Sequence, residues 1–121
     1  MLTLLVAVAA GVGAVARYVA DQLVQQRTRR EFPLGTLLVN VTGSLLLGLV
    51  VGLSLHHGLG DRTLLVVGTG FAGGYTTLST WAWESLALAE TGQVLEAGLN
   101  VAGSFALGLV AAAAGLGLAL L

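Results

Sequence analysis

The sequence contains no cysteine and no lysine, and only 9% of its 121 residues are charged. Without cysteine, the chain can form neither a disulfide nor a thiolate metal site, and it has no thiol nucleophile. Five arginines against six acidic residues give a formal net charge of −1, so there is no basic surface to attract nucleic acid. Soluble domains carry about 25% charged residues. So low a charge indicates a protein that lies in a membrane and whose partners are lipid and other membrane-embedded chains.

Stretches without any charged residue make up most of the chain, and 56% of all residues are hydrophobic. A helix needs about 20 mostly apolar residues to cross a bilayer. Stretches near or above this length lie at residues 1–16, 33–60, 63–83 and 97–121. They predict an all-α integral membrane protein with four transmembrane helices, multi-pass in the cell membrane and organised as a single domain over residues 1–121. The short connections leave no room for a soluble catalytic domain.

We expect helices at about residues 2–19, 33–56 and 63–90, and a fourth that runs to the C-terminus. No basic segment precedes the first apolar stretch and no small-residue cleavage site follows it, so it is expected to remain as a helix. Glu84 and Glu90 then fall near the end of the third helix, where we interpret them as charges at the membrane interface.

Arginines are unevenly distributed between the connections. The first connection holds three and the second holds one, namely Arg27, Arg29 and Arg30 against Arg62. By the positive-inside rule, this bias predicts that the first connection is cytoplasmic and that both termini lie outside. Arg17 lies near the end of the first apolar stretch, where a long cation can reach interfacial water. It is interpreted either as an interfacial anchor or as part of a water-filled vestibule that attracts anions.

A repeated polar stripe marks the second and fourth spans. The segments "NVTGSLLLG" at 40–48 and "NVAGSFALG" at 100–108 agree at six of nine positions. In both, small or polar residues recur every four positions and so share one helical face: Asn40, Ser44 and Gly48, and Asn100, Ser104 and Gly108. Small residues let membrane helices pack closely. An unpaired amide in hydrocarbon costs several kcal/mol, so Asn40 is predicted to have a polar partner.

The third span contains the segment "GFAGGYTTLST" at 70–80. Glycine is about 1 kcal/mol worse than alanine inside a helix, so a break in this helix is predicted. Non-helical backbone at membrane depth is tolerated only where it is buried in protein or lines water. Freed carbonyls could bind a cation, and the hydroxyls could donate hydrogen bonds to an anion. The alternative is that each hydroxyl simply bonds back to its own helix.

Three segments together resemble a known family, the Fluc or CrcB fluoride channels. "GFAGGYTTLSTW" resembles the family's third-helix motif, typically Gly-Gly-X-Thr-Thr-Phe-Ser-Thr-Phe, while "GAVARY" at 13–18 and "GTLLVNVTGS" at 35–44 resemble its other signatures in the same order. The resemblance covers essentially the whole chain. It implies an antiparallel, dual-topology homodimer in a bacterial plasma membrane, through which fluoride leaves the cell passively and fluoride toxicity is relieved.

The same resemblance implies where the ions bind. A structural, non-transported Na⁺ would lie at the dimer centre, held by the backbone carbonyls of Gly73 and Thr76 from both subunits. Asn40 matches the family's pore asparagine, whose amide can donate to fluoride, and Arg17 would lie in the vestibule. The rest of the ion pathway would consist of residues that match or neighbour the family's polar track: Thr77, Ser79, Thr80, Trp81 and Ser104.

The sequence departs from the family pattern at its aromatic positions. Leu78 and Trp81 replace two phenylalanines whose positive ring edges face the anion, and Asn100 stands where the family often has tyrosine. Trp81 can replace one edge and adds an N–H donor, whereas Leu78 cannot. The arginine bias also raises the possibility of a fixed orientation, which would require a paralogous partner. We favour the homodimer, because so small a bias can be overcome.

Two other classes of membrane protein remain as alternatives. A four-helix proton-coupled drug exporter has a similar architecture but needs a membrane-buried carboxylate in its first helix, and residues 1–20 contain none. In a non-transporting assembly subunit, the stripes would serve packing alone. An enzyme is not expected, because no nucleophile with an adjacent base and no phosphate-binding loop is present.

Overall fold

The computed structural model describes residues 1–28 and 31–121. Within these residues the secondary structure is helical and no strand is present, which confirms the all-α prediction. The elements are α1 (Leu2–Thr28), α2 (Leu34–His57), α3 (Asp61–Thr63), the π-helical segment η1 (Leu64–Ala72), α4 (Gly73–Tyr75), α5 (Ser79–Glu90) and α6 (Val94–Leu118).

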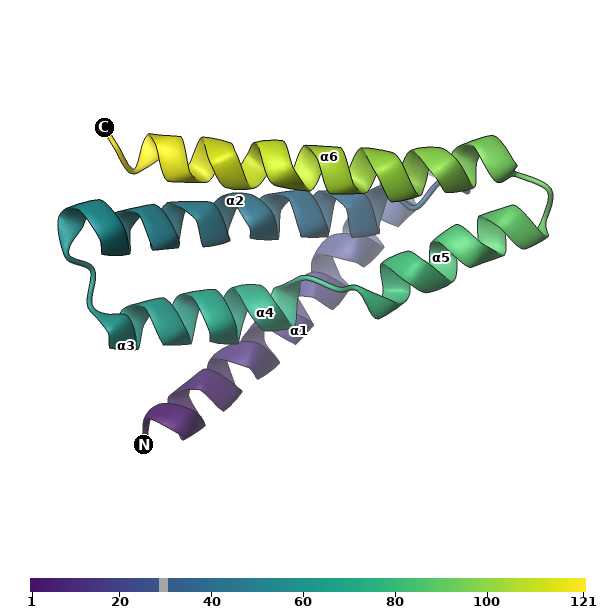
Figure 1. The fold of residues 1–121 in the computed structure, drawn as a ribbon. Helices are drawn as coiled ribbons and strands as arrows, with labels where there is room; N and C mark the ends of the chain where they lie inside the picture. Colours follow the sequence, from purple (N-terminus) through teal and green to yellow (C-terminus); the bar gives the residue numbers. More distant parts are fainter. Residues whose placement is uncertain (29–30) are drawn as a thin grey trace.

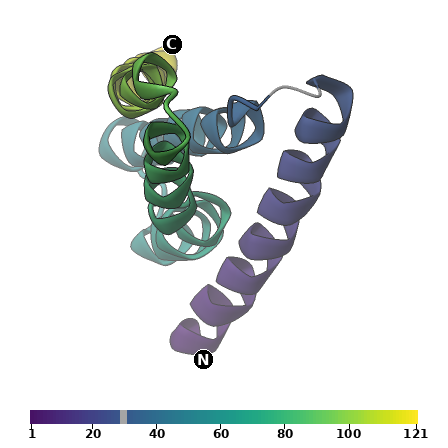
Figure 2. The same cartoon turned by 90° about the vertical axis from the view of Figure 1, so that its right-hand side faces the viewer.

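α2 and α6 lie side by side and run in the same direction (Figure 1). α3, η1 and α4 run back beneath α2, and α5 continues beyond them toward the opposite end of the molecule. α1 leans away from the α2–α6 pair as a separate arm (Figure 2) but contacts η1, α4 and α2. The chain thus passes back and forth along one axis.

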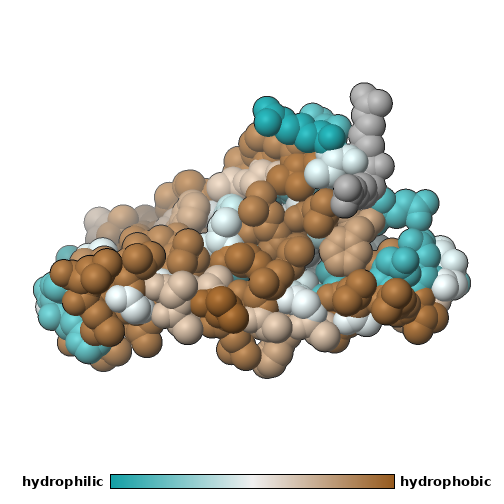
Figure 3. All heavy atoms as spheres, turned by 90° about the horizontal axis from the view of Figure 1, so that it is seen from above, coloured by the Kyte–Doolittle hydropathy of each residue, from teal (hydrophilic) through white to brown (hydrophobic). Residues whose placement is uncertain are grey.

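Three helices are long and apolar enough to cross a membrane, judged over the described residues: α1, α2 and α6. Their leucine and valine side chains are largely exposed, as at Leu4 (61%), Val15 (65%) and Leu109 (58%). Figure 3 shows this hydrophobic surface along the body of the molecule, with hydrophilic residues gathered toward its ends. A bilayer covers such a surface, so the chain is a multi-pass membrane protein.

The first helix is longer than the sequence predicted, because it continues past Val19 to Thr28. The prediction treated the polar residues after Asp21 as a loop. Glutamine, leucine and arginine are all good helix formers, and no glycine or proline interrupts the chain before Pro33. The end of the apolar stretch therefore marks a change of surroundings rather than the end of the helix.

Glycines allow α2 and α6 to approach closely. A Cβ at Gly48 would collide with the Ala112 carbonyl oxygen, and a Cβ at Gly115 with the Leu45 carbonyl oxygen. Packing of small residues drives helix association in membranes, where the hydrophobic effect is absent between helices. The stripe predicted from the repeat is therefore a packing surface along its C-terminal part.

A second pair of glycines seats α1 against the third segment of the chain. A Cβ at Gly13 would collide with the Phe71 carbonyl oxygen, and a Cβ at Gly74 with that of Ala10. These contacts bring α1 within reach of the residues that follow α4. The position of Arg17, one turn beyond Gly13 on α1, depends on this approach.

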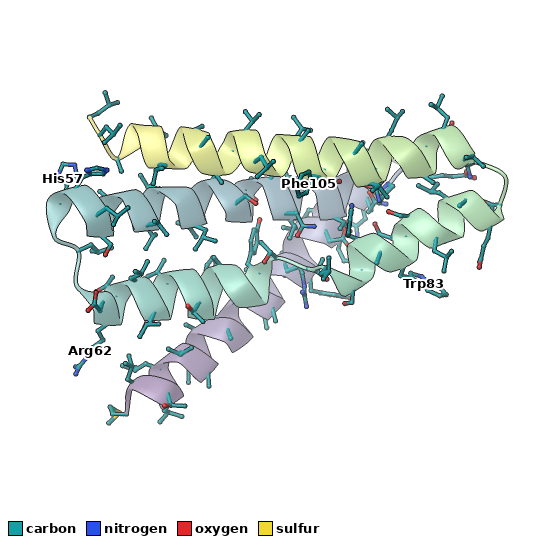
Figure 4. The ribbon with its side chains drawn as sticks, in the orientation of Figure 1. His57, Arg62, Trp83 and Phe105 are labelled. Atoms are coloured by element: carbon teal, nitrogen blue, oxygen red, sulfur yellow. The ribbon has the colours of Figure 1, made fainter. Side chains whose placement is uncertain are left out.

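At each end of the molecule, a hydrogen bond links segments that are far apart in the sequence. Both termini lie toward the end that carries the α2–α3 connection (Figure 1), and the His57 ring nitrogen Nε2 lies 2.5 Å from the Ala119 carbonyl oxygen. Figure 4 shows His57 beside the C-terminus. At the opposite end, Gln93 Nε2 donates to Glu31 Oε2 at 2.9 Å. Both termini on one side is the arrangement expected for an even number of crossings.

Candidate functional site

Regular helical backbone stops at Tyr75 and resumes at Ser79. Thr76 has an extended conformation, with φ −79° and ψ 160°. Glycine before this point and threonine and serine after it are weak helix formers, because glycine loses the most backbone entropy and the hydroxyls compete for backbone groups. We call residues 76–78 the interruption.

The Asn40 side chain pairs with the backbone of the interruption. Its Nδ2 donates to the Thr77 carbonyl oxygen at 2.9 Å, and its Oδ1 accepts from the Thr77 N–H at 2.8 Å. In an unbroken helix, the Thr77 N–H would instead donate to the Gly73 carbonyl. Asn40 thus has the polar partner that was predicted for it. Because the Thr77 N–H donates to Asn40, it does not donate to the Gly73 carbonyl.

The Thr76 carbonyl has lost its helical donor in a similar way. The Thr80 N–H, which would bond it in a continuous helix, donates to Thr77 Oγ1 at 3.2 Å. Arg17 Nη1 donates to the Thr76 carbonyl oxygen at 3.0 Å. Side chains of α1 and α2 therefore hold the interruption from two sides, and the Gly73 and Thr76 carbonyls stand outside the helical ladder.

Arg17 also lines a cavity of about 220 Å³, which we call the outer cavity. The cavity is lined by residues of α1, α2, the interruption and α5: Ala14, Arg17, Tyr18, Asp21, Thr36, Val39, Thr77 and Thr80. A guanidinium carries five N–H donors, and one bond to Thr76 leaves others to face the cavity. The sequence suggested an interfacial anchor or a vestibule residue, and the contact with the interruption was not anticipated.

A larger hollow of about 540 Å³, which we call the central groove, runs between α2, η1, the interruption and α6. Its polar lining residues are Asn40, Ser44, Thr69, Thr76, Thr77 and Ser104. Leu78, Trp81 and Phe105 add apolar surface. Leu78 and Phe105 are 73% and 68% exposed, so this groove has an open side.

The two hollows bring together nearly all of the residues selected from the sequence. Asn40, Gly73, Thr76, Trp81 and Ser104 line the central groove, Arg17 and Thr80 line the outer cavity, and Thr77 lines both. Ser79 is exposed and lines neither. Thr77 therefore lies between the central groove and the outer cavity, as a lining residue of both.

A hydrogen-bonded cluster joins α5 to α6 beside the central groove. Trp81 Nε1 donates to the Asn100 carbonyl oxygen at 3.1 Å, and Asn100 Nδ2 donates to Ser85 Oγ at 2.7 Å. Ser104 Oγ donates to Asn100 Oδ1 at 3.3 Å, and Asn100 is fully buried. The Trp81 N–H, which the sequence offered as a donor for an anion, is thus used within the protein, and Trp81 presents its ring to the groove.

Glu84 contacts the first turn of α2, and its place at the membrane interface stays a prediction. Thr36 Oγ1 donates to Glu84 Oε1 at 2.8 Å. Glu84 Oε2 is buried and has no hydrogen-bond partner among the described residues.

Phe105 is a groove residue that sequence reasoning missed. Its phenyl ring lies on α6 beside the central groove (Figure 4), directly after the polar stripe residue Ser104. The sequence signal that could have identified Phe105 is its position directly after Ser104 in the repeated polar stripe. By contrast, Trp83 lies on the outer side of α5 (Figure 4) and is 68% exposed.

Comparison with known proteins connects this arrangement to a family. A family model described as "CrcB-like protein, Camphor Resistance (CrcB)" matches residues 4–116. A protein of Leifsonia xyli subsp. xyli named "Fluoride-specific ion channel FluC 1" is 49% identical over 118 residues, which are 98% of this chain and 85% of that protein.

Two further relatives have similar names. "Fluoride-specific ion channel FluC 2" of Mycobacterium tuberculosis H37Rv is 48% identical over 105 residues, covering 87% of this chain and 80% of that protein. "Fluoride-specific ion channel FluC 1" of Streptomyces avermitilis is 46% identical over 112 residues, covering 93% and 90%. These relatives are named as channels and not as enzymes, in keeping with the expectation from sequence. The chain belongs to the CrcB-like family.

Proposed function

We propose that this protein is a fluoride-specific channel that lets fluoride leave the cell passively and so protects against its toxicity. The observation that carries the proposal is the interruption. There Asn40 pairs with Thr77, Asn40 lines the central groove, and Thr77 lines both hollows. The identity of the ion comes from the names of relatives that share nearly half of their residues with this chain.

Fluoride is small and strongly hydrated, so a pore must replace its water with hydrogen-bond donors. Asn40 Nδ2 carries two hydrogens, and one bond to Thr77 leaves the other for an ion. Thr77 Oγ1 accepts from Thr80, which leaves the Thr77 hydroxyl hydrogen to donate. With the free N–H groups of Arg17, these donors form a path from the outer cavity to the central groove. Thr80 adds a hydroxyl in the outer cavity, whereas Ser79 lines neither hollow, so its place in the pathway rests on the family resemblance alone.

Other hydroxyls of the central groove already donate within the protein. Ser44 Oγ donates to the Asn40 carbonyl at 2.7 Å, Thr76 Oγ1 to the Ala72 carbonyl at 3.0 Å, and Ser104 Oγ to Asn100. Their hydrogens are less available to an anion than that of Thr77. We therefore assign Ser104 a secondary role in the pathway and Trp81 the role of an aromatic wall.

A structural Na⁺ could use the Gly73 carbonyl, which the interruption frees, and the second lone pair of the Thr76 carbonyl, whose first accepts from Arg17 Nη1. Gly73 and Thr76 both line the central groove, and the N–H groups that would bond their carbonyls in a helix are used elsewhere. No group of three or more His, Asp or Glu that could hold a metal occurs among residues 1–28 and 31–121, and we propose backbone carbonyls as the ligands. When bound, the ion would supply a positive charge next to these carbonyl oxygens.

Two carbonyls do not complete the coordination of Na⁺, so we propose that a second copy supplies the rest. The open side of the central groove, with exposed Leu78 and Phe105, would be covered by that copy in an antiparallel homodimer. In this arrangement η1, α4 and α5 together form an interrupted fourth crossing beside α1, α2 and α6. A paralogous partner is the alternative.

The test is fluoride efflux from liposomes that contain the purified protein and Na⁺. A fluoride electrode should record efflux without ATP or a proton gradient, whereas chloride should be retained. Asn40→Ala should reduce the flux while the dimer stays intact by size-exclusion chromatography. No efflux from the unmodified protein would overturn the channel proposal, and efflux that requires a proton gradient would favour the exporter.

A further inference from the structure

The cluster around Asn100 closes a ring of hydrogen bonds through Trp81. Trp81 Nε1 donates to the Asn100 backbone carbonyl, the Asn100 amide donates to Ser85 Oγ, and Ser85 Oγ donates to the Trp81 carbonyl at 2.8 Å. Trp81 is thus attached at its side chain and, through Ser85, at its backbone. Two attachments one helical turn apart prevent α5 from rotating against α6.

The Asn100 side chain is satisfied at both ends. Its Nδ2 has Ser85 as a partner and its Oδ1 has Ser104, while the residue is fully buried. Few polar groups are retained in such surroundings without a partner, because an unsatisfied buried amide is costly. Any side chain that cannot both donate and accept would leave Ser85 or Ser104 without its bond.

The position of Trp81 matters more in this chain because Leu78 offers no ring. Trp81 is the aromatic residue of α5 that lines the central groove, whereas Trp83 is directed outward (Figure 4). With its N–H held by α6, the indole cannot swing into the groove or away from it. The width of the groove at this point is then set by the α5–α6 attachment.

We propose that Asn100 is a positioning residue that fixes the Trp81 ring as one wall of the central groove and so sets the discrimination between fluoride and larger anions. The proposal rests on the proposed channel function. It assigns Asn100 no contact with the ion, since both of its polar ends are used within the protein.

The experiment uses the fluorescence of Trp81 together with ion flux. The chain contains two tryptophans, so Trp83→Phe leaves Trp81 as the single reporter. In that background, Asn100→Leu keeps the side-chain volume and removes the hydrogen bonds to Ser85 and Ser104, while the backbone carbonyl that accepts from Trp81 Nε1 remains. Acrylamide should then quench Trp81 more strongly, and fluoride flux should fall roughly tenfold or more, because two buried hydrogen bonds are lost. Chloride leakage should rise.

Three matched variants separate positioning from general damage. Val101→Ala, at an exposed position next to Asn100 on α6, should change neither quenching nor the chloride-to-fluoride ratio. Ser85→Ala removes the same Asn100–Ser85 bond from the α5 side, together with the bond from Ser85 to the Trp81 carbonyl, and should shift both readouts in the same direction as Asn100→Leu. With Trp81→Phe already present, Asn100→Leu should leave the chloride-to-fluoride ratio unchanged.

The possible failures are distinguishable. If the Trp83→Phe protein passes no fluoride while the natural sequence does, the flux arm is repeated in the natural sequence. If neither passes fluoride, the proposed function fails, and the quenching of Trp81 still tests its attachment. If quenching and the ion ratio are unchanged in both Asn100→Leu and Ser85→Ala, the positioning role is overturned. If Asn100→Leu does not assemble, Ser85→Ala decides alone.

Discussion

At the scale of single residues, Asn40 stands out because one amide replaces two helical hydrogen bonds. It accepts from the Thr77 N–H and donates to the Thr77 carbonyl. Leaving a buried donor or acceptor unsatisfied costs about 1–3 kcal/mol. The interruption is therefore stable only while a side chain that both donates and accepts faces Thr77.

Replacing Asn40 tests this double role. Asn40→Leu removes both bonds, so we expect fluoride flux to fall about tenfold or more and the thermal unfolding temperature in detergent to drop. Asn40→Asp keeps the acceptor for the Thr77 N–H but adds negative charge beside an anion path, so flux should also fall, with a smaller loss of stability. An Asp variant that conducts as well as the unmodified protein would remove the amide donor from the pathway.

Arg17 gives a second prediction at this scale. Hydrogen bonds that involve a charged group are worth about 1.5–3 kcal/mol, and Nη1 donates to the Thr76 carbonyl. Arg17→Gln should lower fluoride flux by about tenfold or more, whereas Arg17→Lys, which keeps the charge, should retain more of it. Flux is measured with the fluoride electrode. Arg27→Gln, at an exposed position on the same helix, is the control and should leave flux unchanged.

The sequence predicted that Asn40 needs a polar partner but could not identify it. The partner is the Thr77 backbone, 37 residues away on another element. Every residue has the same backbone groups, so the amino-acid types could not identify it. The same reason explains why the contact between Arg17 and Thr76, 59 residues apart, was not predicted. Resemblance selected these positions, and the structure brings them into contact, but which residue meets which required coordinates.

At the scale of elements, close glycine contacts determine how α2 meets α6. We expect Gly48→Ala and Gly115→Ala to destabilise the protein by about 1–3 kcal/mol each, because the added methyl would collide with backbone rather than with a movable side chain. The measurement is thermal unfolding in detergent. Gly117→Ala on α6 is the matched control: nothing lies within 4 Å of its Cβ position, and alanine is the better helix former. Equal destabilisation at Gly117 would contradict the contact argument.

Element boundaries were predictable where composition and helix ends coincide. α2 and α6 begin and end near the predicted residues. α1 was predicted too short, because hydrophobicity marks the membrane and not the helix. The π-helical segment at Leu64–Ala72 was not predicted, since the wider turn has no characteristic composition. The glycines and hydroxyls of residues 70–80 indicated a low helix propensity. The position of the interruption depends on Arg17 of α1 and Asn40 of α2, which bond its backbone.

At the scale of the whole molecule, the sequence indicated a multi-pass membrane protein and its family. It could not determine the assembly, because the arginine bias and the antiparallel homodimer point in opposite directions. Arg17 lies within the body of α1 rather than at its end or in a connection, so it is left out of the count. The bias therefore stays at three arginines against one, a small difference that the insertion machinery can override.

The orientation can be read directly because the chain has no cysteine of its own. Gly60→Cys places a thiol at the α2–α3 connection, where nothing lies within 4 Å of the added Cβ, and Thr91→Cys places one at the exposed α5–α6 connection. An antiparallel homodimer needs both orientations equally. A membrane-impermeant maleimide added to intact cells should therefore label about half of the chains at either position, as expected where charge does not fix topology.

Lysis before labelling is the control, since it should expose every thiol and bring both variants to full labelling. If intact cells label one variant fully and the other not at all, every chain is inserted in the same sense, and two copies cannot face each other in opposite orientations. Gly73 and Thr76 would then need the carbonyls of a different chain to complete a sodium site. His56→Arg would add a second arginine to the side of the membrane that carries Arg62, and in that fixed-orientation case it should restore partial labelling at both positions by reducing the bias to three arginines against two.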